Sequence, residues 1–350
     1  VSAYYLTHFE TGAVKFWVHA GTAKVFADDG TTRTEITPAA PFTGGVDDRW
    51  GGGVLGGVLV MNNGIDQPQF WGGNPANKLA TLTGWNSAWR ANVVVPFKNY
   101  LVALNILKTA TRFSSMVKWS HSAVPGAIPT SWDETNVTLD AGEQDLAETT
   151  DALVDALPLG DSLILYKERS MYSMAFIGQP FIWRFQRIPG SVGMLHKGCG
   201  VVTPAGHVVL TAGDVVLFDG QQTQSIADGK VRRFIFGNID SANFKKAFVV
   251  KNLIDNEVLI CFPTPGSAAC NKAAVWNWQT KAWGVRDLPG VTYGAEGQIS
   301  DSVTESWSSD VDTWIEDQTT WGQSADLEPN QDRLLLCTTA KIAAFDVGLK

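Results

Sequence analysis

A rhythm of short apolar runs and tight turns, repeating about every forty residues, constrains this chain more than any other feature. Each unit has three or four runs of strand-forming residues, separated by turns that contain glycine, asparagine or aspartate. The recognisable units lie at 13–36, 51–71, 89–107, 161–188, 199–226, 245–290 and 332–348. This period is typical of propeller blades. We therefore predict an all-β, β-propeller-like fold with six or seven blades of antiparallel strands.

Helical periodicity is almost absent from the sequence. The stretch 146–160 has apolar spacing that fits one short helix, from Leu153 to Leu157, which would stop at Pro158. No other stretch fits a period of 3.6 residues for more than two turns. The rest of the chain is therefore predicted to consist of strands and turns.

The domain organisation is expected to be a single propeller-like region over residues 1–350. The N-terminus has neither an initiator methionine nor a signal-peptide pattern, so we expect the region to be part of a longer chain. Residues 40–90 are expected to form either a variable blade or a small inserted domain. Within them, the glycine-rich stretch 51–57 lacks the Lys-Ser/Thr ending of a P-loop, and we interpret it as a strand that another backbone approaches closely.

Charge and composition limit the possible partners. The formal net charge is -8, which argues against a general nucleic-acid-binding protein but does not exclude a surface past which DNA slides without sticking. Charged residues make up 18% of the chain, below the roughly 25% typical of soluble domains. This composition fits a surface that is partly covered by neighbouring protein, and it equally fits a compact extracellular β protein. No apolar run approaches eighteen residues, and no membrane span is predicted.

Catalytic and metal-binding motifs are not apparent. The sequence has no G-x-S-x-G motif, no nucleotide-binding fingerprint and no C-x-x-C pair, so no metal site or cofactor is predicted. The stretch 308–314 resembles the Asp-box turn of sialidase-type propellers, but it is one residue short and lacks the glycine. Paired carboxylates such as Asp310 and Asp312 are interpreted as solvated turn residues. We predict that the protein is not an enzyme, and that its four cysteines are buried free thiols.

Two tryptophans bracket an irregular segment at residues 117–132. Pro125 and Pro129 lack amide donors and bias the preceding residues away from helix, so the segment is predicted to be a loop. Trp119 and Trp132 would anchor its two ends. We interpret it as a structural loop at a blade edge that contacts another protein, or as a segment whose rings only fill a groove between blades.

Residues 90–290 resemble the tail hub, or nozzle, proteins of short-tailed bacteriophages, which are also called DNA-stabilisation or tail tubular proteins. The motifs that carry the resemblance are Trp119-Ser120, Trp132, Gly160-Asp161, Tyr166-Lys167, Ser170-Met171-Tyr172, Pro180-Phe181, Phe218-Asp219-Gly220 and the strand 275–283. The family usually carries aspartate after Trp-Ser, where this chain has His121.

The resemblance implies a structural virion protein that forms the distal tail tube, retains the packaged genome and provides the channel for ejection of double-stranded DNA. It implies a propeller with extra domains, assembled as a ring, commonly a hexamer, without a cofactor. Expected partners are the tail adaptor and portal complex, a tail fibre or spike, and a tail needle or plug. The location would be the virion tail, assembled in the host cytoplasm. The structural or interaction candidates are Trp119, Ser120, Trp132, Phe181, Asp219, Gly220 and Trp283.

Two alternatives belong to other classes of protein. A carbohydrate-binding or carbohydrate-hydrolysing propeller would place several tryptophans around one pocket with paired carboxylates. The candidates for that pocket are Trp50, Trp71, Trp85, Trp307, Trp314 and Trp321. A monomeric extracellular or periplasmic scaffold would have oxidised cysteines and a signal peptide in the full gene.

Overall fold

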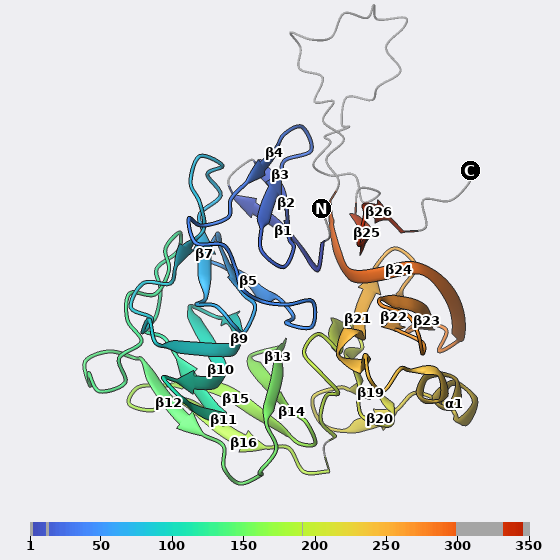
Figure 1. Cartoon of the computed structure of the whole chain (residues 1–350). Helices are drawn as coiled ribbons and strands as arrows, with labels where there is room; N and C mark the ends of the chain where they lie inside the picture. The colour runs from blue at the N-terminus through green and yellow to red at the C-terminus, as the bar shows by residue number, and fades with distance from the viewer. Residues whose placement is uncertain (1–2, 12–13, 191, 299–331, 346–350) are drawn as a thin grey trace, which may run out of the picture.

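The computed structural model describes residues 3–11, 14–190, 192–298 and 332–345. In these residues, antiparallel sheets stand side by side around a central axis, as Figure 1 shows. There are six sheets, and the chain passes through them in sequence order. The fold is therefore a six-bladed β-propeller, within the predicted range of six or seven blades.

The first three blades have four strands each. Blade 1 contains β1 (Tyr5–Thr11), β2 (Val14–Ala20), β3 (Val25–Asp28) and β4 (Arg33–Glu35). Blade 2 contains β5 (Gly51–Leu55), β6 (Val58–Asn62), β7 (Gln69–Trp71) and β8 (Ala80–Thr81). Blade 3 contains β9 (Trp89–Phe97), β10 (Tyr100–Lys108), β11 (Thr111–Trp119) and β12 (Gly142–Asp145). From blade 1 to blade 6, the first strand of each blade contacts the first strand of the next, so the first strands surround the axis.

The second half of the chain continues the pattern and enlarges the last blade. Blade 4 contains β13 (Leu153–Leu159), β14 (Ser162–Lys167), β15 (Met171–Gly178) and β16 (Ile182–Arg187). Blade 5 contains β17 (Gly200–Thr203), β18 (Gly206–Leu210), β19 (Val215–Phe218) and β20 (Thr223–Ser225). Blade 6 contains β21 (Phe248–Asn252), β22 (Glu257–Phe262), β23 (Cys270–Asn277), β24 (Trp283–Gln298), β25 (Asp332–Thr338) and β26 (Ile342–Ala344).

The long strand β24 closes the ring. Its first part pairs with β23 and its last part pairs with β25; the two pairings meet at Val291, next to Gly290, which has a φ of 81°. β24 also contacts β21 and β1, the first strands of blades 6 and 1. The last sheet therefore fills the ring up to the N-terminal blade (Figure 1).

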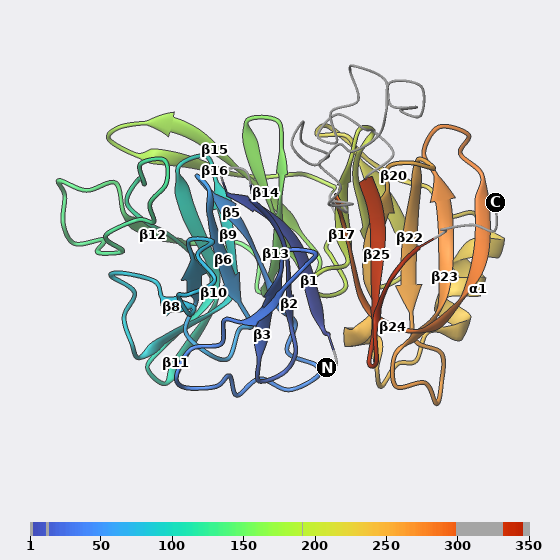
Figure 2. The ribbon, with the colours of Figure 1, turned by 90° about the horizontal axis from the view of Figure 1, so that it is seen from above.

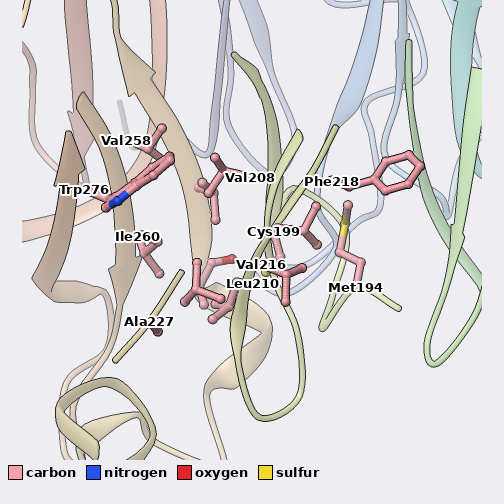
Figure 3. Close-up of a cluster of buried hydrophobic side chains, with 14 of the residues drawn as sticks. Met194, Cys199, Val208, Leu210, Val216, Phe218, Ala227, Val258, Ile260 and Trp276 are labelled. Carbon is pink, nitrogen blue, oxygen red and sulfur yellow. Dashed lines mark hydrogen bonds between the residues drawn. The ribbon is translucent and has the colours of Figure 1, made fainter. Parts of the chain in front are cut away.

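The hydrophobic core consists of clusters between neighbouring blades. One cluster joins blades 4, 5 and 6, and Figure 3 shows part of it, with Phe218, Val208 and Trp276 from three different strands. Other clusters fill the spaces between blades 1 and 2, 2 and 3, and 3 and 4. A small cluster of Ala3, Leu6, Leu335 and Cys337 joins blade 1 to β25. Burial of both faces of a sheet explains the continuous apolar runs in the sequence.

The predicted helix from Leu153 to Leu157 is wrong, because these residues belong to strand β13. The pairing with β14 shifts register between Leu153 and Asp155, which indicates an irregularity of the β-bulge kind. Leu153 and Ala156 pack toward blade 3, whereas Val154 packs toward blade 5. A bulged strand with both faces buried therefore reproduced the apolar spacing of a helix.

The structure has a helix that the sequence analysis missed. Helix α1 (Gly229–Asn238) follows blade 5, and the Asp228 carboxylate caps it by accepting hydrogen bonds from the amides of Lys230 and Val231. A short 3-10 helix, η1 (Phe244–Lys246), precedes blade 6. Within the described ranges, no helix is long and apolar enough to cross a membrane.

Strands β5–β8 lie in the stretch 40–90, for which both a blade and an inserted domain were considered. Gly52 in β5 has a φ of 147°, and a Cβ atom there would lie 2.0 Å from the carbonyl oxygen of Val60. The glycine-rich stretch is therefore a strand that another backbone approaches closely, as predicted. Only glycine fits this position.

Candidate docking surface

Antiparallel strands alternate in direction, so the turns after the first and third strands of each blade lie on one face of the propeller. Figure 2 shows the strands running between this face and the opposite one. Hydrogen bonds join these turns: the amide of Ala123 donates to the carbonyl of Asn99 (2.7 Å), and the amide of Gly126 donates to the carbonyl of Gly56 (2.7 Å). We call this side, formed by the turns after first and third strands, the hairpin face.

Trp119 fixes the first end of the loop between β11 and β12. Its ring is buried between blades 3 and 4 and lies 5.8 Å from the ring of Phe185. Its Nε1 donates a hydrogen bond to the carbonyl of Asp140 at 2.7 Å. A Cβ atom on Gly142 would lie 2.5 Å from the Trp119 ring, so glycine leaves room for the indole.

Trp132 fixes the loop on the other side of blade 3. It is buried between blades 2 and 3, with its ring perpendicular to that of Trp85 at 4.8 Å. Its Nε1 has no hydrogen-bond partner among the described residues. The two tryptophans therefore anchor the loop in two different interblade clusters, and the loop spans the end of blade 3.

Ser120 and His121 set the direction in which the loop leaves β11. The Ser120 hydroxyl is buried, accepts from the amide of Leu101 (3.0 Å) and donates to the carbonyl of His121 (2.8 Å). His121 Nδ1 accepts a hydrogen bond from the amide of Asp140 at 3.1 Å. His121 thus joins the two ends of the loop.

Asp140 connects the loop to two blades. Its carboxylate accepts hydrogen bonds from the Tyr100 hydroxyl (3.3 Å), the Ser122 hydroxyl (3.0 Å) and the side-chain amide of Gln179 (3.3 Å). Burial raises the pKa of Tyr100 to about 12, and the charge of Asp140 acts in the same direction. The Tyr100 hydroxyl therefore stays protonated and remains a donor to Asp140.

Phe181 lies in the turn between β15 and β16. Gln179 of the same turn donates the hydrogen bond to Asp140. The Phe181 side chain is 73% exposed, and its neighbours Phe176 and Ile177 are 44% and 48% exposed. The ring of Phe176 packs at 5.3 Å against buried Trp183. The hairpin thus has a fixed aromatic base and an exposed apolar tip.

An open groove of about 400 Å³ runs beside this tip, between the strands β12 and β16. Its apolar wall consists of Leu146, Tyr172, Ile177, Phe181, Trp183 and Phe185. Its polar lining consists of Gln144, Asp145, Glu148 and Arg184. β12 and β16 are the last strands of their sheets in the described chain, so the groove lies at the outer edge of the propeller. We call it the outer groove.

Asp219, Gly220 and Trp283 belong to blades 5 and 6, away from the outer groove between blades 3 and 4. Asp219 accepts hydrogen bonds from the amides of Gln221 and Gln222, both at 2.9 Å, and the amides lower the pKa of its carboxyl group. Gly220 completes the turn with a φ of 102°. Trp283 Nε1 donates to the carbonyl of Ile226 at 3.0 Å, which joins blade 6 to the segment after blade 5. These contacts serve the turns and the blade packing.

The structure thus brings Trp119, Ser120, Trp132 and Phe181 together on blades 3 and 4 of the hairpin face. The sequence analysis missed Asp140, Tyr100 and Gln179, which link the loop to the hairpin. Tyr100 and Gln179 lie 40 and 39 residues from Asp140 along the chain, so no local sequence pattern indicates these contacts.

Buried polar side chains lie at the propeller axis. The Lys197 ammonium donates to the carbonyls of Arg49 (2.9 Å) and Asn92 (2.9 Å), and burial lowers its pKa to about 8. Asp155 accepts from the amide of Gly198 at 2.9 Å, and burial raises the pKa of its carboxyl group. The remaining cavity of about 190 Å³ cannot hold a DNA duplex, whose major groove alone is about 12 Å wide.

The described tryptophans named for a sugar-binding pocket do not form an exposed platform. Trp50, Trp71 and Trp85 are buried, and their Nε1 atoms donate to backbone carbonyls. Trp307, Trp314 and Trp321, together with Asp310 and Asp312, lie outside the described residues. The four cysteines are free and buried, as predicted; they are Cys199, Cys261, Cys270 and Cys337.

Comparisons with known proteins support the fold alone. No protein-family model matches the sequence, and a search of characterised proteins finds no match. The extracellular domain of BT4673 from B. thetaiotaomicron is similar in structure, with a TM-score of 0.54, 9% identity, and coverage of 98% of this chain and 40% of that one. The WD40 β-propeller domain of Doa1 matches with a TM-score of 0.48 and 8% identity, over 98% of this chain and 95% of that one. AztD from Citrobacter koseri matches with a TM-score of 0.41 and 12% identity, over 83% and 87%.

Proposed function

We propose that this protein is a non-enzymatic structural component of the tail of a short-tailed bacteriophage, where copies assemble into the distal tube. The observation that carries the proposal is the apolar surface of blades 3 and 4 on the hairpin face, held by Trp119, Trp132 and Asp140. Exposed apolar patches of this kind mark sites of protein contact. The family-like motifs at Trp119-Ser120, Trp132 and Phe181 occur on the same surface.

The path of DNA in this proposal is the lumen of a ring of copies, for which six is the expected number. The axis of a single propeller is not the path in this proposal, because the cavity there measures only about 190 Å³. The net charge of -8 supports a lumen that repels the phosphate backbone and lets the genome leave without binding.

The partners in this proposal are the tail adaptor and portal complex, a tail fibre or spike, and a needle or plug. The location is the virion tail, after assembly in the host cytoplasm. The four buried free thiols are consistent with assembly in a reducing compartment.

The decisive experiment is the mass of the purified protein by light scattering, alone and with each candidate tail protein. We expect a ring, either alone or after the adaptor is added. A chain that stays monomeric with every tail component would contradict the proposal. If a ring forms, cryo-electron microscopy would show whether its lumen is wide enough for a DNA duplex.

A further inference from the structure

The most exposed large apolar side chains of blades 3 and 4 belong to two neighbouring loops of the hairpin face. Val124 (69% exposed) and Val137 (96%) lie in the β11–β12 loop; Ile177 lies near the end of β15, and Phe181 lies in the β15–β16 turn. The hydrogen bond between Gln179 and Asp140 holds these loops together. Exposed apolar side chains therefore lie on both loops, and those of the β15–β16 hairpin, Ile177 and Phe181, also line the outer groove.

The outer groove combines apolar anchoring with an acidic wall. Tyr172, Trp183 and Phe185 contribute aromatic rings to it, while Asp145 and Glu148 contribute two carboxylates against the single guanidinium of Arg184. Glu148 and Arg184 are exposed. A ligand that is apolar with added positive charge would match this lining better than a neutral or acidic one.

The groove is already shaped in the free chain. Trp183 is buried at its base, and Trp119 packs against Phe185 at 5.8 Å. Ordering of these side chains would therefore cost little on binding. Both flanking strands, β12 and β16, are sheet edges in the described chain, where an extended segment can lie alongside.

We propose that the outer groove binds an extended apolar segment that carries lysine or arginine and belongs to another protein. The identification of the other protein as a tail component rests on the proposed function. The chemistry expected of the bound segment rests only on the residues that line the groove. A second copy of this chain is the competing occupant, and light scattering of a groove variant tests it.

Fluorescence anisotropy with two fluorescein-labelled decapeptides tests the proposal. One peptide alternates leucine with lysine, and the other alternates leucine with glutamate. We expect the lysine peptide to bind at least tenfold more tightly than the glutamate peptide. Equal binding of the two peptides, or no binding of either, would overturn the proposal.

Variants locate the site. Phe181→Ser and Glu148→Lys should each weaken binding of the lysine peptide at least fivefold, whereas Val285→Ser, which changes a side chain 56% exposed on blade 6, should leave it unchanged. Circular dichroism checks that each variant is folded. Loss of binding in Val285→Ser, or retention in both groove variants, would overturn the proposal.

Light scattering of Phe181→Ser tests the competing occupant. If this change converts an oligomer into a monomer, a second copy occupies the surface and the proposal is wrong. If the peptide results are as expected while no ring forms with any tail protein, the proposed binding in the outer groove is supported and the proposed tail function is wrong.

Discussion

The carboxylate of Asp140 in the β11–β12 loop accepts a hydrogen bond from the side-chain amide of Gln179 in the β15–β16 hairpin, at 3.3 Å. The two residues belong to different blades, and each lies in a segment that carries exposed apolar side chains. The same carboxylate binds the hydroxyls of Tyr100 and Ser122. One acidic side chain therefore fixes the relative position of the two parts of the docking surface.

Replacement of Asp140 by alanine should lower the free energy of unfolding by about 1–3 kcal/mol, because three donors lose a shared acceptor in a partly buried site. Urea unfolding measures the change. The control is Asp161→Ala, which removes a fully exposed carboxylate paired with Lys98 and should leave the free energy of unfolding nearly unchanged. Equal effects of the two variants would contradict the role of Asp140.

The two bracketing tryptophans should differ in their tolerance of phenylalanine. Trp119→Phe removes the hydrogen bond to the Asp140 carbonyl, whereas Trp132→Phe removes an Nε1 that has no partner among the described residues. Trp119→Phe should therefore be more destabilising, by about 1–3 kcal/mol. The comparison of the two urea midpoints checks this, and a larger loss for Trp132→Phe would show that the assignment is wrong.

The thiols should be unreactive in the folded protein. All four cysteines are buried, and burial raises the pKa of Cys199, Cys270 and Cys337 to about 12. We expect no rapid reaction with Ellman's reagent at pH 8, and four thiols per chain after denaturation without reductant. Fewer than four thiols after denaturation would indicate a disulfide and favour the extracellular alternative.

Acid should destabilise the protein partly through His19. Burial lowers the pKa of this side chain from 6.5 to about 4. Between pH 6.5 and pH 4 the unfolded chain therefore binds a proton that the folded chain does not, and the free energy of unfolding falls as the pH falls. His19 stacks on Phe26 at 5.4 Å, and its Nδ1 has no partner among the described residues.

His19→Leu tests this prediction. The variant should lose less stability than the wild type between pH 6.5 and pH 4, by roughly 1–3 kcal/mol. Urea unfolding at several pH values across this range measures the difference. Parallel pH profiles for the two proteins would exclude His19 as a contributor.

The blade pattern could be predicted from the sequence because turn chemistry and apolar runs are local. Helix α1 could not, because its signal was one capping residue, Asp228, in a stretch that otherwise looks like a turn. Strand β13 was mistaken for a helix because a register shift and burial on both faces disguised its alternation. Local patterns fail where neighbouring blades decide which side chains are buried.

The candidate site was predictable only in part. Trp119 and Trp132 were identified as loop anchors because proline and tryptophan define such a loop locally. The partners that give the surface its shape, Tyr100 and Gln179, are distant along the chain from Asp140. Exposure of Phe181 likewise depends on the position of the hairpin relative to blade 3, which no nearby residue encodes.

The strand β24 has a consequence for how the ring comes apart. It is hydrogen-bonded to β23 on one stretch and to β25 on the next, and it contacts β1 of the first blade. A terminal repeat of an open solenoid can fray alone, since it contacts only one neighbour. Here β24 both contacts β1 and pairs with β23 and β25 of blade 6, so separation of blade 1 from β24 would also disturb blade 6. The propeller should therefore melt as one cooperative body, without peeling from either end.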